Sequence, residues 1–248
     1  MSSPQSVHAW DEPSGIAPRG TLVLLPGRGE HGGVYERFGR RIAADGYRVR
    51  ALGDAALDPD AVLDEAAKLL RDETLPGPRV LVGADTGALY AAQLAARGTP
   101  GLDALILAGL PAAPHATATA RDWEDELDQR TACPTHRGRL TSDAELRRGA
   151  LADTPTPELP TPTGVSVPVL ALHGADDTVS PLADARLAYG ALPGVELVSL
   201  AGTRHDALND LTHRTAAATV VLFLERLRLS PGRGQHALAP IATREDLA

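Results

Sequence analysis

Short, continuous runs of apolar residues recur along the chain and are its clearest structural signal. Thr21–Leu25, Arg79–Gly83, Leu102–Leu110 and Val167–His173 are apolar over most of their length, without a regular alternation of polar residues. A strand that is buried on both faces has this pattern, and parallel sheets covered by helices contain such strands. The runs therefore predict the central strands of a parallel sheet.

Helical patterns separate these strands. In the first of them Phe38 and Ile42 are four residues apart, so they share one face of a helix. Because strands and helices alternate, right-handed crossovers should place helices on both faces of the sheet. The sequence predicts an α/β fold with a mostly parallel central sheet. The remaining predicted elements are helices at 34–44, 60–72, 86–97, 181–192 and 211–227, strands at 47–52 and 195–200, and a short edge strand at 7–10.

The alternation is interrupted between residues 112 and 165. This segment contains two charged helical stretches, at 121–130 and 142–150, and ends in a spacer rich in proline. Proline-rich spacers are stiff and extended, so the segment is expected to be tied back onto the rim of the sheet. The predicted organisation is a core formed by 1–111 and 166–229, a cap insertion at 112–165, and a flexible C-terminal tail at 230–248.

Composition narrows the class of protein. The 248 residues are 43% apolar and 23% charged, which is ordinary for a soluble globular domain, and the net charge of −8 argues against nucleic-acid binding. Cys133 is the only cysteine, so no disulfide can form within the chain. The sequence shows neither a signal peptide nor a membrane span. We therefore predict a cytoplasmic protein whose partner is a small-molecule substrate.

The run that ends at Gly83 leads into the pattern Gly-x-Asp-x-Gly, centred on Asp85, and then into an alanine-rich helix. This is the layout of a nucleophile elbow, a sharp strand-to-helix turn that exposes one side chain above the sheet. Gly83 and Gly87 suit such a turn, because the departing helix passes close to neighbouring backbone. The common version of the elbow has Ser at the centre, whereas this one has Asp.

Two further loops at the carboxyl ends of predicted strands contain candidate catalytic residues. Asp176 and Asp177 follow one strand, and His205 follows the next. The order nucleophile, acid, histidine, with separations of 92 and 28 residues from Asp85 to Asp177 to His205, is that of the α/β-hydrolase triad. Asp177 is the favoured acid, and Asp176 is interpreted as its solvated neighbour.

Together these motifs resemble the α/β-hydrolase superfamily and, within it, the monoacylglycerol lipase and lysophospholipase-like branch of serine aminopeptidase type. Pro26-Gly27-Arg28-Gly29-Glu30-His31 is similar to the His-Gly-x-Gly-Glu-His loop of that branch, and His205-Asp206-Ala207-Leu208-Asn209 to its His-x-x-x-Asn ending. The resemblance covers roughly residues 20–228. Two positions depart from the pattern: Pro26 replaces the usual His, and Asp85 replaces the usual Ser.

The resemblance implies a role for each matching residue. Asp85 would be the nucleophile, Asp177 would orient His205, and the backbone N–H groups of Arg28 and Thr86 would form an oxyanion hole. Such a site needs no metal and no organic cofactor.

The replacement of Ser by Asp changes the expected chemistry. A carboxylate is already ionised at pH 7, and its attack on an alkyl carbon gives an ester that an activated water can hydrolyse. Haloalkane dehalogenases and epoxide hydrolases, which are branches of the superfamily, use an Asp in this way. However, those branches usually have Trp after the nucleophile, where this chain has Thr86, and the insertion at 112–165 contains none of the tyrosines that epoxide hydrolases use as acids.

Several other residues are candidate substrate contacts. His31 is expected mainly to stabilise its own loop, with substrate contact as the alternative, and Trp123 is the only tryptophan of the insertion. Arg137, with Arg130, Arg139 and His136, is interpreted as part of a solvated face that could instead contact an anionic group of a substrate. Cys133 is predicted to be a small buried apolar residue.

The sequence thus favours a small-molecule hydrolase with an Asp-His-Asp triad, acting on an ester-like substrate, an epoxide or an alkyl halide. Two alternatives stay open. One is a lyase or isomerase in which Asp85 acts only as an acid or base. The other is a catalytically silent binding protein that has kept the pocket.

Overall fold

A computed structural model describes residues 7–112, 120–159 and 162–229. Seven strands form one sheet in the order β1-β3-β2-β4-β5-β6-β7, in which β1 is antiparallel and all other pairs are parallel. This confirms the predicted α/β fold with a mostly parallel sheet. The strands are β1 His8–Trp10, β2 Gly20–Leu25, β3 Tyr47–Ala51, β4 Arg79–Ala84, β5 Ala104–Ala108, β6 Val169–Gly174 and β7 Val195–Leu200.

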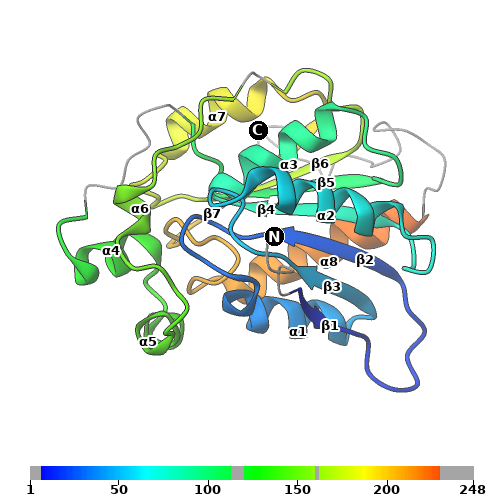
Figure 1. Ribbon diagram of the computed structural model, residues 1–248, viewed down its shortest axis with the longest axis horizontal. Helices are drawn as coiled ribbons and strands as arrows, with labels where there is room; N and C mark the ends of the chain where they lie inside the picture. Colours follow the sequence, from blue (N-terminus) through cyan, green and yellow to red (C-terminus); the bar gives the residue numbers. More distant parts are fainter. Residues whose placement is uncertain (1–6, 113–119, 160–161, 230–248) are drawn as a thin grey trace, which may run out of the picture.

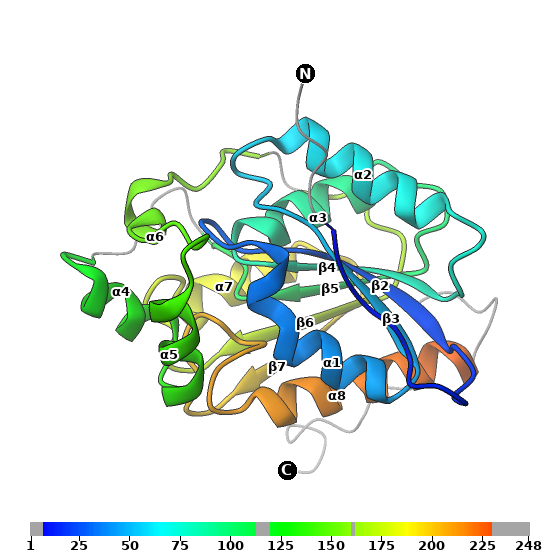
Figure 2. The same cartoon turned by 60° about the horizontal axis from the view of Figure 1, so that its bottom comes forward.

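Helices cover both faces of the sheet (Figures 1 and 2). Two apolar clusters show the division: one packs α1 and α8 against one face, and the other packs α2, α3 and α7 against the opposite face. The helices are η1 Gly32–Tyr35 (a 3-10 turn), α1 Glu36–Ala44, α2 Pro59–Arg71, α3 Thr86–Ala96, α4 Trp123–Arg130, α5 Pro134–Ser142, α6 Ala150–Asp153, α7 Leu182–Gly190 and α8 His213–Leu229.

The ends of the helices follow local sequence rules. The Asp58 side chain accepts a hydrogen bond from the Ala61 N–H at the start of α2, and Pro59 occupies the first turn, where its missing N–H costs nothing. Asp122 caps α4 in the same way through the Asp125 N–H. Asp58 and Asp122 thus fix the first residues of α2 and α4, because each accepts a hydrogen bond from an N–H group of the first turn.

The central strands β2 and β6 are buried along their whole length, and β4 along its middle four residues. The exposed edge differs: β7 is mostly half-buried. Continuous apolar runs therefore identified the strands at the centre of the sheet, as expected for strands that are covered on both faces.

One predicted helix is wrong. Residues 142–150 do not form a helix; instead α5 ends at Ser142 and α6 begins at Ala150. Between them the Asp143 carboxylate accepts hydrogen bonds from the N–H groups of Glu145 and Leu146, and Gly149 has a φ of +85°. The turn formed by Asp143 replaces helical hydrogen bonds, so the charged pattern there reflects a turn.

Helices α4, α5 and α6 lie together at one end of the sheet (Figures 1 and 2). Hydrogen bonds join them to the loop that follows β2: Arg130 of α4 donates to the Arg28 carbonyl, and the Arg147 N–H donates to the Gly29 carbonyl. The segment at 112–165 thus contacts the carboxyl edge of the strands through its described residues. The tail predicted for 230–248 lies outside the described residues.

Candidate active site

Asp85 lies in the turn between β4 and α3 with φ +47° and ψ −125°, and it is the only non-glycine residue with positive φ among those described. Such a conformation is strained and occurs preferentially at functional sites. The neighbouring glycines make it possible. A Cβ on Gly83 would lie 2.4 Å from the Gly87 carbonyl oxygen, and a Cβ on Gly87 would lie 2.4 Å from the carbonyl oxygens of Leu25 and Pro26. The turn therefore has the geometry that the elbow pattern predicts.

The structure brings the three predicted triad residues together. His205 Nδ1 is 2.8 Å from Asp177 Oδ2, and His205 Nε2 is 3.2 Å from Asp85 Oδ1. The first contact is a hydrogen bond, whereas the second is an ion-pair contact without hydrogen-bond alignment. Side chains from three separate loops thus lie in a row, with His205 between the carboxylates of Asp85 and Asp177.

Asp177 is fixed by more than His205. Its Oδ1 accepts hydrogen bonds from the N–H groups of Val179 and Ser180, and its Oδ2 lies 3.2 Å from Nε2 of His173. Burial raises the pKa of this carboxyl, but His205 and His173 outweigh burial and lower the pKa below the ordinary value. Asp177 therefore stays ionised and can orient the His205 ring. Asp176 is exposed and makes no comparable contact with His205.

Arg28 is the main feature of the site that sequence reasoning missed. Its backbone N–H, predicted as an oxyanion-hole donor, donates to Asp85 Oδ2 at 2.9 Å. Its side chain, which is fully buried, also points at Asp85: Nε donates to Oδ2 at 2.8 Å and Nη2 donates to Oδ1 at 2.7 Å. This is a bidentate guanidinium–carboxylate pair, the strongest kind of side-chain ion pair.

A signal for this pair was present in the sequence. Replacing Ser by Asp places a negative charge at the elbow, and Arg28 is a cation in the loop that was predicted to face the elbow. A buried carboxylate requires a compensating charge. We therefore interpret Arg28 as the cation that compensates the buried charge of Asp85.

These charges set the protonation of the site. Burial raises the pKa of Asp85, but the Arg28 guanidinium and His205 more than offset this and hold the pKa well below its ordinary value. Burial lowers the pKa of His205, but the carboxylates of Asp177 and Asp85 reverse the effect and raise the pKa to about 10. At neutral pH the site consequently contains two anions and two cations.

A second group of buried charged side chains contacts the loop that follows β2. Arg130 of α4 donates to the Glu30 carboxylate at 3.1 Å, to the Arg28 carbonyl at 2.9 Å, and to the Glu126 carboxylate at 3.0 Å. Glu30 in turn accepts from the Tyr35 hydroxyl. The interpretation of Arg130 and His136 as parts of a solvated face is wrong, because both are buried and His136 contacts Asp206 at 3.1 Å.

The remaining candidates lie away from the triad. His31 caps η1, since its Nδ1 accepts from the Gly33 N–H, and its Nε2 contacts Asp143 at 3.0 Å. Arg137 pairs with Glu124 and Asp128, and the Arg148 guanidinium lies 5.0 Å from the ring centre of Trp123. The structure does not bring these three side chains into contact with Asp85.

Thr86, the other predicted oxyanion-hole residue, is the first residue of α3 and is fully buried. Its hydroxyl forms no hydrogen bond within the described part of the chain. Cys133 is buried as predicted, with the Arg37 guanidinium 3.3 Å from its sulfur. Among the described helices, none has the length and apolar character needed to cross a membrane.

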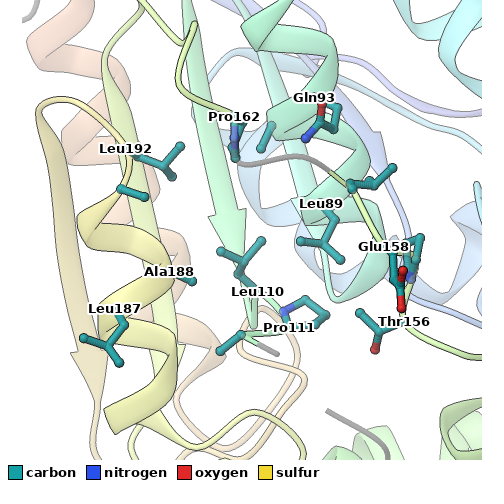
Figure 3. A pocket seen from close by; sticks show the side chains of 15 residues that line it. Leu89, Gln93, Leu110, Pro111, Thr156, Glu158, Pro162, Leu187, Ala188 and Leu192 are labelled. Carbon is teal, nitrogen blue, oxygen red and sulfur yellow. The ribbon is translucent and has the colours of Figure 1, made fainter. Parts of the chain in front are cut away.

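The largest described cavity does not adjoin the predicted triad. The cavity beside Asp85 and His205 has a volume of only about 10 Å³. A much larger cavity, of about 600 Å³, runs between α3 and α7 (Figure 3). Its walls are mostly apolar, and Figure 3 shows Thr156 at the end of the cavity where β5 leads into Leu110 and Pro111. We call this cavity the α3–α7 cleft.

Comparison with known proteins gives structural likenesses only, since no family model and no curated protein matches the sequence. A monoacylglycerol lipase from Paleococcus ferrophilus superposes with a TM-score of 0.70 at 14% identity, over 89% of this chain and 98% of that one. A soluble variant of the monoglyceride lipase from Saccharomyces cerevisiae gives 0.72 at 16% identity, over 89% and 91%. The enol-lactonase from Burkholderia xenovorans LB400 gives 0.63 at 18% identity, over 89% and 97%. These likenesses establish that the chain has the α/β-hydrolase fold.

Proposed function

We propose that this protein is a small-molecule hydrolase that cleaves a carbon–oxygen bond through a covalent intermediate on Asp85. The observation that carries the proposal is the alignment of Asp85, His205 and Asp177 at a strained elbow, with contacts of 3.2 and 2.8 Å. A nucleophile, a proton carrier and an orienting carboxylate in this order are the parts that covalent hydrolysis needs.

The protonation of the site supports a specific first step. Ionised Asp85 attacks the electrophilic carbon of the substrate through one carboxylate oxygen, and a carbon–oxygen bond forms. The bond from that carbon to the leaving oxygen breaks, and its electron pair stays on the oxygen. Because its pKa is raised to about 10, His205 is an imidazolium and gives its Nε2 proton to this oxygen.

This role of His205 bears on the choice of substrate. A departing alkoxide needs a proton, whereas a departing halide does not. A cationic His205 therefore favours an epoxide or an ester-like oxygen leaving group over an alkyl halide. His205 would also take the place of the tyrosine acids of epoxide hydrolases, since residues 112–165 contain no tyrosine.

In the second step the ester on Asp85 is hydrolysed. Esterification removes the Asp85 charge, so His205 keeps only one of the two carboxylates that raise its pKa; its pKa falls, and the ring is more readily neutral and available as a general base near neutral pH. Neutral His205 takes a proton from water, and the hydroxide oxygen attacks Asp85 Cγ. The oxyanion is held by the N–H groups of Arg28 and Thr86, and collapse returns the carboxylate while the released alkoxide takes up the proton of the new hydroxyl group.

The names of the structural neighbours agree with carbon–oxygen chemistry, since they include lipases, an esterase and an enol-lactonase. At 14–20% identity these neighbours support the fold alone, so the assignment of chemistry depends on the triad geometry.

Heavy-oxygen labelling under single-turnover conditions tests the proposal. The protein is incubated in H₂¹⁸O with a panel of esters and terminal epoxides and is then digested with trypsin. The peptide at 80–97 lies between Arg79 and the bond after Arg97, and Asp85 is its only acidic side chain. A mass increase of one heavy oxygen in this peptide, with product formed, is the expected result.

Product without label would refute the covalent mechanism and leave Asp85 as a base for hydrolysis, elimination or isomerisation. The low pKa of Asp85 speaks against that role, because a general base works best when its pKa is near the working pH.

One observation favours a second candidate, a catalytically silent binding protein. Arg28 occupies both carboxylate oxygens of Asp85, and the cavity beside the triad is too small for a substrate. In that case no ester or epoxide would be turned over, and no label would appear.

A further inference from the structure

The small cavity beside the triad has the size of a single water molecule. Its volume is about 10 Å³, which is roughly the least that one water requires. Asp85, His205 and Asn209 are among the residues that line it. In a cavity of this size a water touches the groups on the wall, so it would lie beside the Asp85 carboxyl, the group that becomes an ester in the proposed reaction.

Two buried atoms of the residues on this wall need a hydrogen-bond partner. Asn209 Oδ1 and His205 Nε2 form no hydrogen bond within the described part of the chain, and each residue is only 2% exposed. His205 Nε2 lies 3.2 Å from Asp85 Oδ1 but is not aligned with it. A buried polar atom without a partner is unfavourable. One water in the cavity can bond to both atoms.

The other polar side chains on the wall already have partners. The Tyr35 hydroxyl donates to the Glu30 carboxylate, which also accepts from Arg130. Asp206 contacts His136 at 3.1 Å. The need for a water is therefore confined to the two atoms named above.

The backbone of Asn209 is fixed on both sides. Its N–H donates to the Asp206 carbonyl at 2.8 Å, and its own carbonyl accepts from the guanidinium of Arg37 in α1. A side-chain amide held in this way can keep a water in one place, because either end of an amide can bond to water.

The hydrogen-bonding capacity of the two atoms fits the second step of the proposed reaction. Once His205 has given its proton to the leaving oxygen, neutral Nε2 is an acceptor, and Asn209 Oδ1 is an acceptor as well. A water has two O–H groups, so it can donate one to each. A lone pair of its oxygen is then left for Asp85 Cγ.

We propose that Asn209 is a positioning residue for hydrolysis of the Asp85 ester: its side-chain amide, together with His205 Nε2, holds the attacking water beside Asp85 Cγ. The inference rests on the proposed function, because it concerns the second step of that reaction. The O–H bond that points to His205 breaks, its proton moves to Nε2, and the water oxygen bonds to Cγ. The O–H group that points to Asn209 stays intact, so the amide orients the water and takes no proton.

The rates of the two steps test this role. Formation and hydrolysis of the Asp85 ester are followed by intact-protein mass spectrometry, in single turnovers of a substrate that gives heavy-oxygen label in wild type. Asn209→Leu has a similar volume but no acceptor. Hydrolysis of the ester should slow about 10²-fold, as misplacement of a reacting group does, so the ester should accumulate. Ester formation should change by no more than about threefold, since the water takes no part in it.

Thr203→Val is the matched control. It removes another buried polar group of the same loop, a hydroxyl that bonds to the Thr212 hydroxyl, and Thr203 does not line the cavity. Both rates should stay within about threefold of wild type, because the water and its partners are unchanged.

A purely structural role of Asn209 predicts a different result. A displaced loop would move His205, which acts in both steps, so both rates would fall together. Equal slowing of the two steps in Asn209→Leu would overturn the inference, as would unchanged hydrolysis. If Asn209→Leu does not fold, Asn209→Ala removes the amide without adding apolar bulk, and the same selective loss, of at least about tenfold in hydrolysis, is expected.

A high-resolution crystal structure separates this inference from the proposed function. Wild type should show a water within about 3.2 Å of both Asn209 Oδ1 and His205 Nε2, and Asn209→Leu should lack it. An Asp85 ester that forms and is hydrolysed in a protein without this water would overturn the inference and leave the hydrolase intact. If the water is present but no substrate forms an ester, the proposed function is wrong and the water's role in hydrolysis falls with it, while its binding site stands.

Discussion

Two regions lie on either side of Thr156 and have opposite properties. The charged corner, formed by Arg28, Asp85, Asp177 and His205, holds the three predicted triad residues, and the cavity beside it has a volume of only about 10 Å³. The α3–α7 cleft has a volume of about 600 Å³ but is lined by none of the triad residues. In a site that is ready to react, space and reactive groups coincide. In this structure the two lie in separate regions.

The two regions also differ in how they are held together. The corner depends on ion pairs among buried groups, in which each charge is needed to compensate another. The cleft depends on apolar packing between helices. A change of volume in such packing costs less stability than the loss of a charge in the corner. Substitutions in the corner should therefore have much larger effects than substitutions in the cleft.

The largest effect is expected for Asp85→Asn. The amide is a poor nucleophile, so turnover should fall about 10⁴-fold or more. Rates are measured with the substrate that gives heavy-oxygen label in wild type, and the intact mass is checked because deamidation would restore Asp. Activity within tenfold of wild type would exclude Asp85 as the nucleophile.

His205→Gln should reduce turnover about 10³-fold, because neither the leaving oxygen nor the attacking water can exchange a proton with the ring. Hydrolysis of the Asp85 ester should be slowed more than its formation, so intact-protein mass spectrometry should show an adduct of the substrate mass. If His205→Gln carries no adduct and turns over substrate at the wild-type rate, His205 is not the proton carrier.

Arg130→Met should destabilise the protein by about 3–5 kcal/mol, because it leaves Glu30 and Glu126 buried without their cation. Urea unfolding measures the change. The matched control is Arg121→Met, which breaks an exposed i,i+4 pair with Asp125 and should change the free energy of unfolding far less, because water screens the pair. Similar losses for the two variants would show that the buried ion pairs of Arg130 contribute no more to stability than an exposed pair.

The pH dependence of the first step should be flat at neutral pH and fall above pH 10. Asp85 is ionised throughout this range because its pKa is held low, whereas His205 loses the required proton as pH passes its pKa of about 10. The rate should then fall about tenfold per pH unit, as for loss of a single essential proton. Single-turnover rates between pH 5 and 11 provide the measurement.

Glu30 is a control for that profile, since burial, together with the Asp206 charge, raises its pKa to about 8 despite Arg130. Glu30→Gln removes this titration, and the loss of rate above pH 10 should remain. A decline centred near pH 7 in both proteins would mean that the His205 proton is held less tightly than the geometry implies.

The smallest effect is expected in the cleft. Ala188→Phe places a ring in the space between α3 and α7, so KM for an apolar substrate should rise about tenfold while kcat changes little. Ala183→Phe, on the exposed side of the same helix, is the control and should leave KM unchanged. A fall in kcat without a change in KM would place substrate binding elsewhere.

Much of the architecture could be predicted from local patterns. Apolar runs identified the central strands. The spacing of Gly83, Asp85 and Gly87 predicted a sharp turn, because a helix that packs closely against neighbouring backbone needs glycine at the two flanking positions. The loops with Asp177 and His205 could be placed beside the elbow because the carboxyl ends of parallel strands share one edge of the sheet. These features depend on residues that are neighbours in the sequence or on the order of strands and helices, and a single sequence shows both.

The sequence alone therefore predicted the sheet, the strand-to-helix turn at Asp85, and the loops that place Asp177 and His205 beside it. Only the tertiary structure decided where the long charged side chains point. Arg28 meets Asp85 57 residues away and Thr156 128 residues away, and Arg130 meets Glu30 100 residues away. A guanidinium can extend into water or fold into a buried ion pair, and the choice depends on partners that arrive only when distant segments pack together. Arg28, which was predicted to contribute a backbone N–H, is for that reason also the residue whose side chain pairs with Asp85.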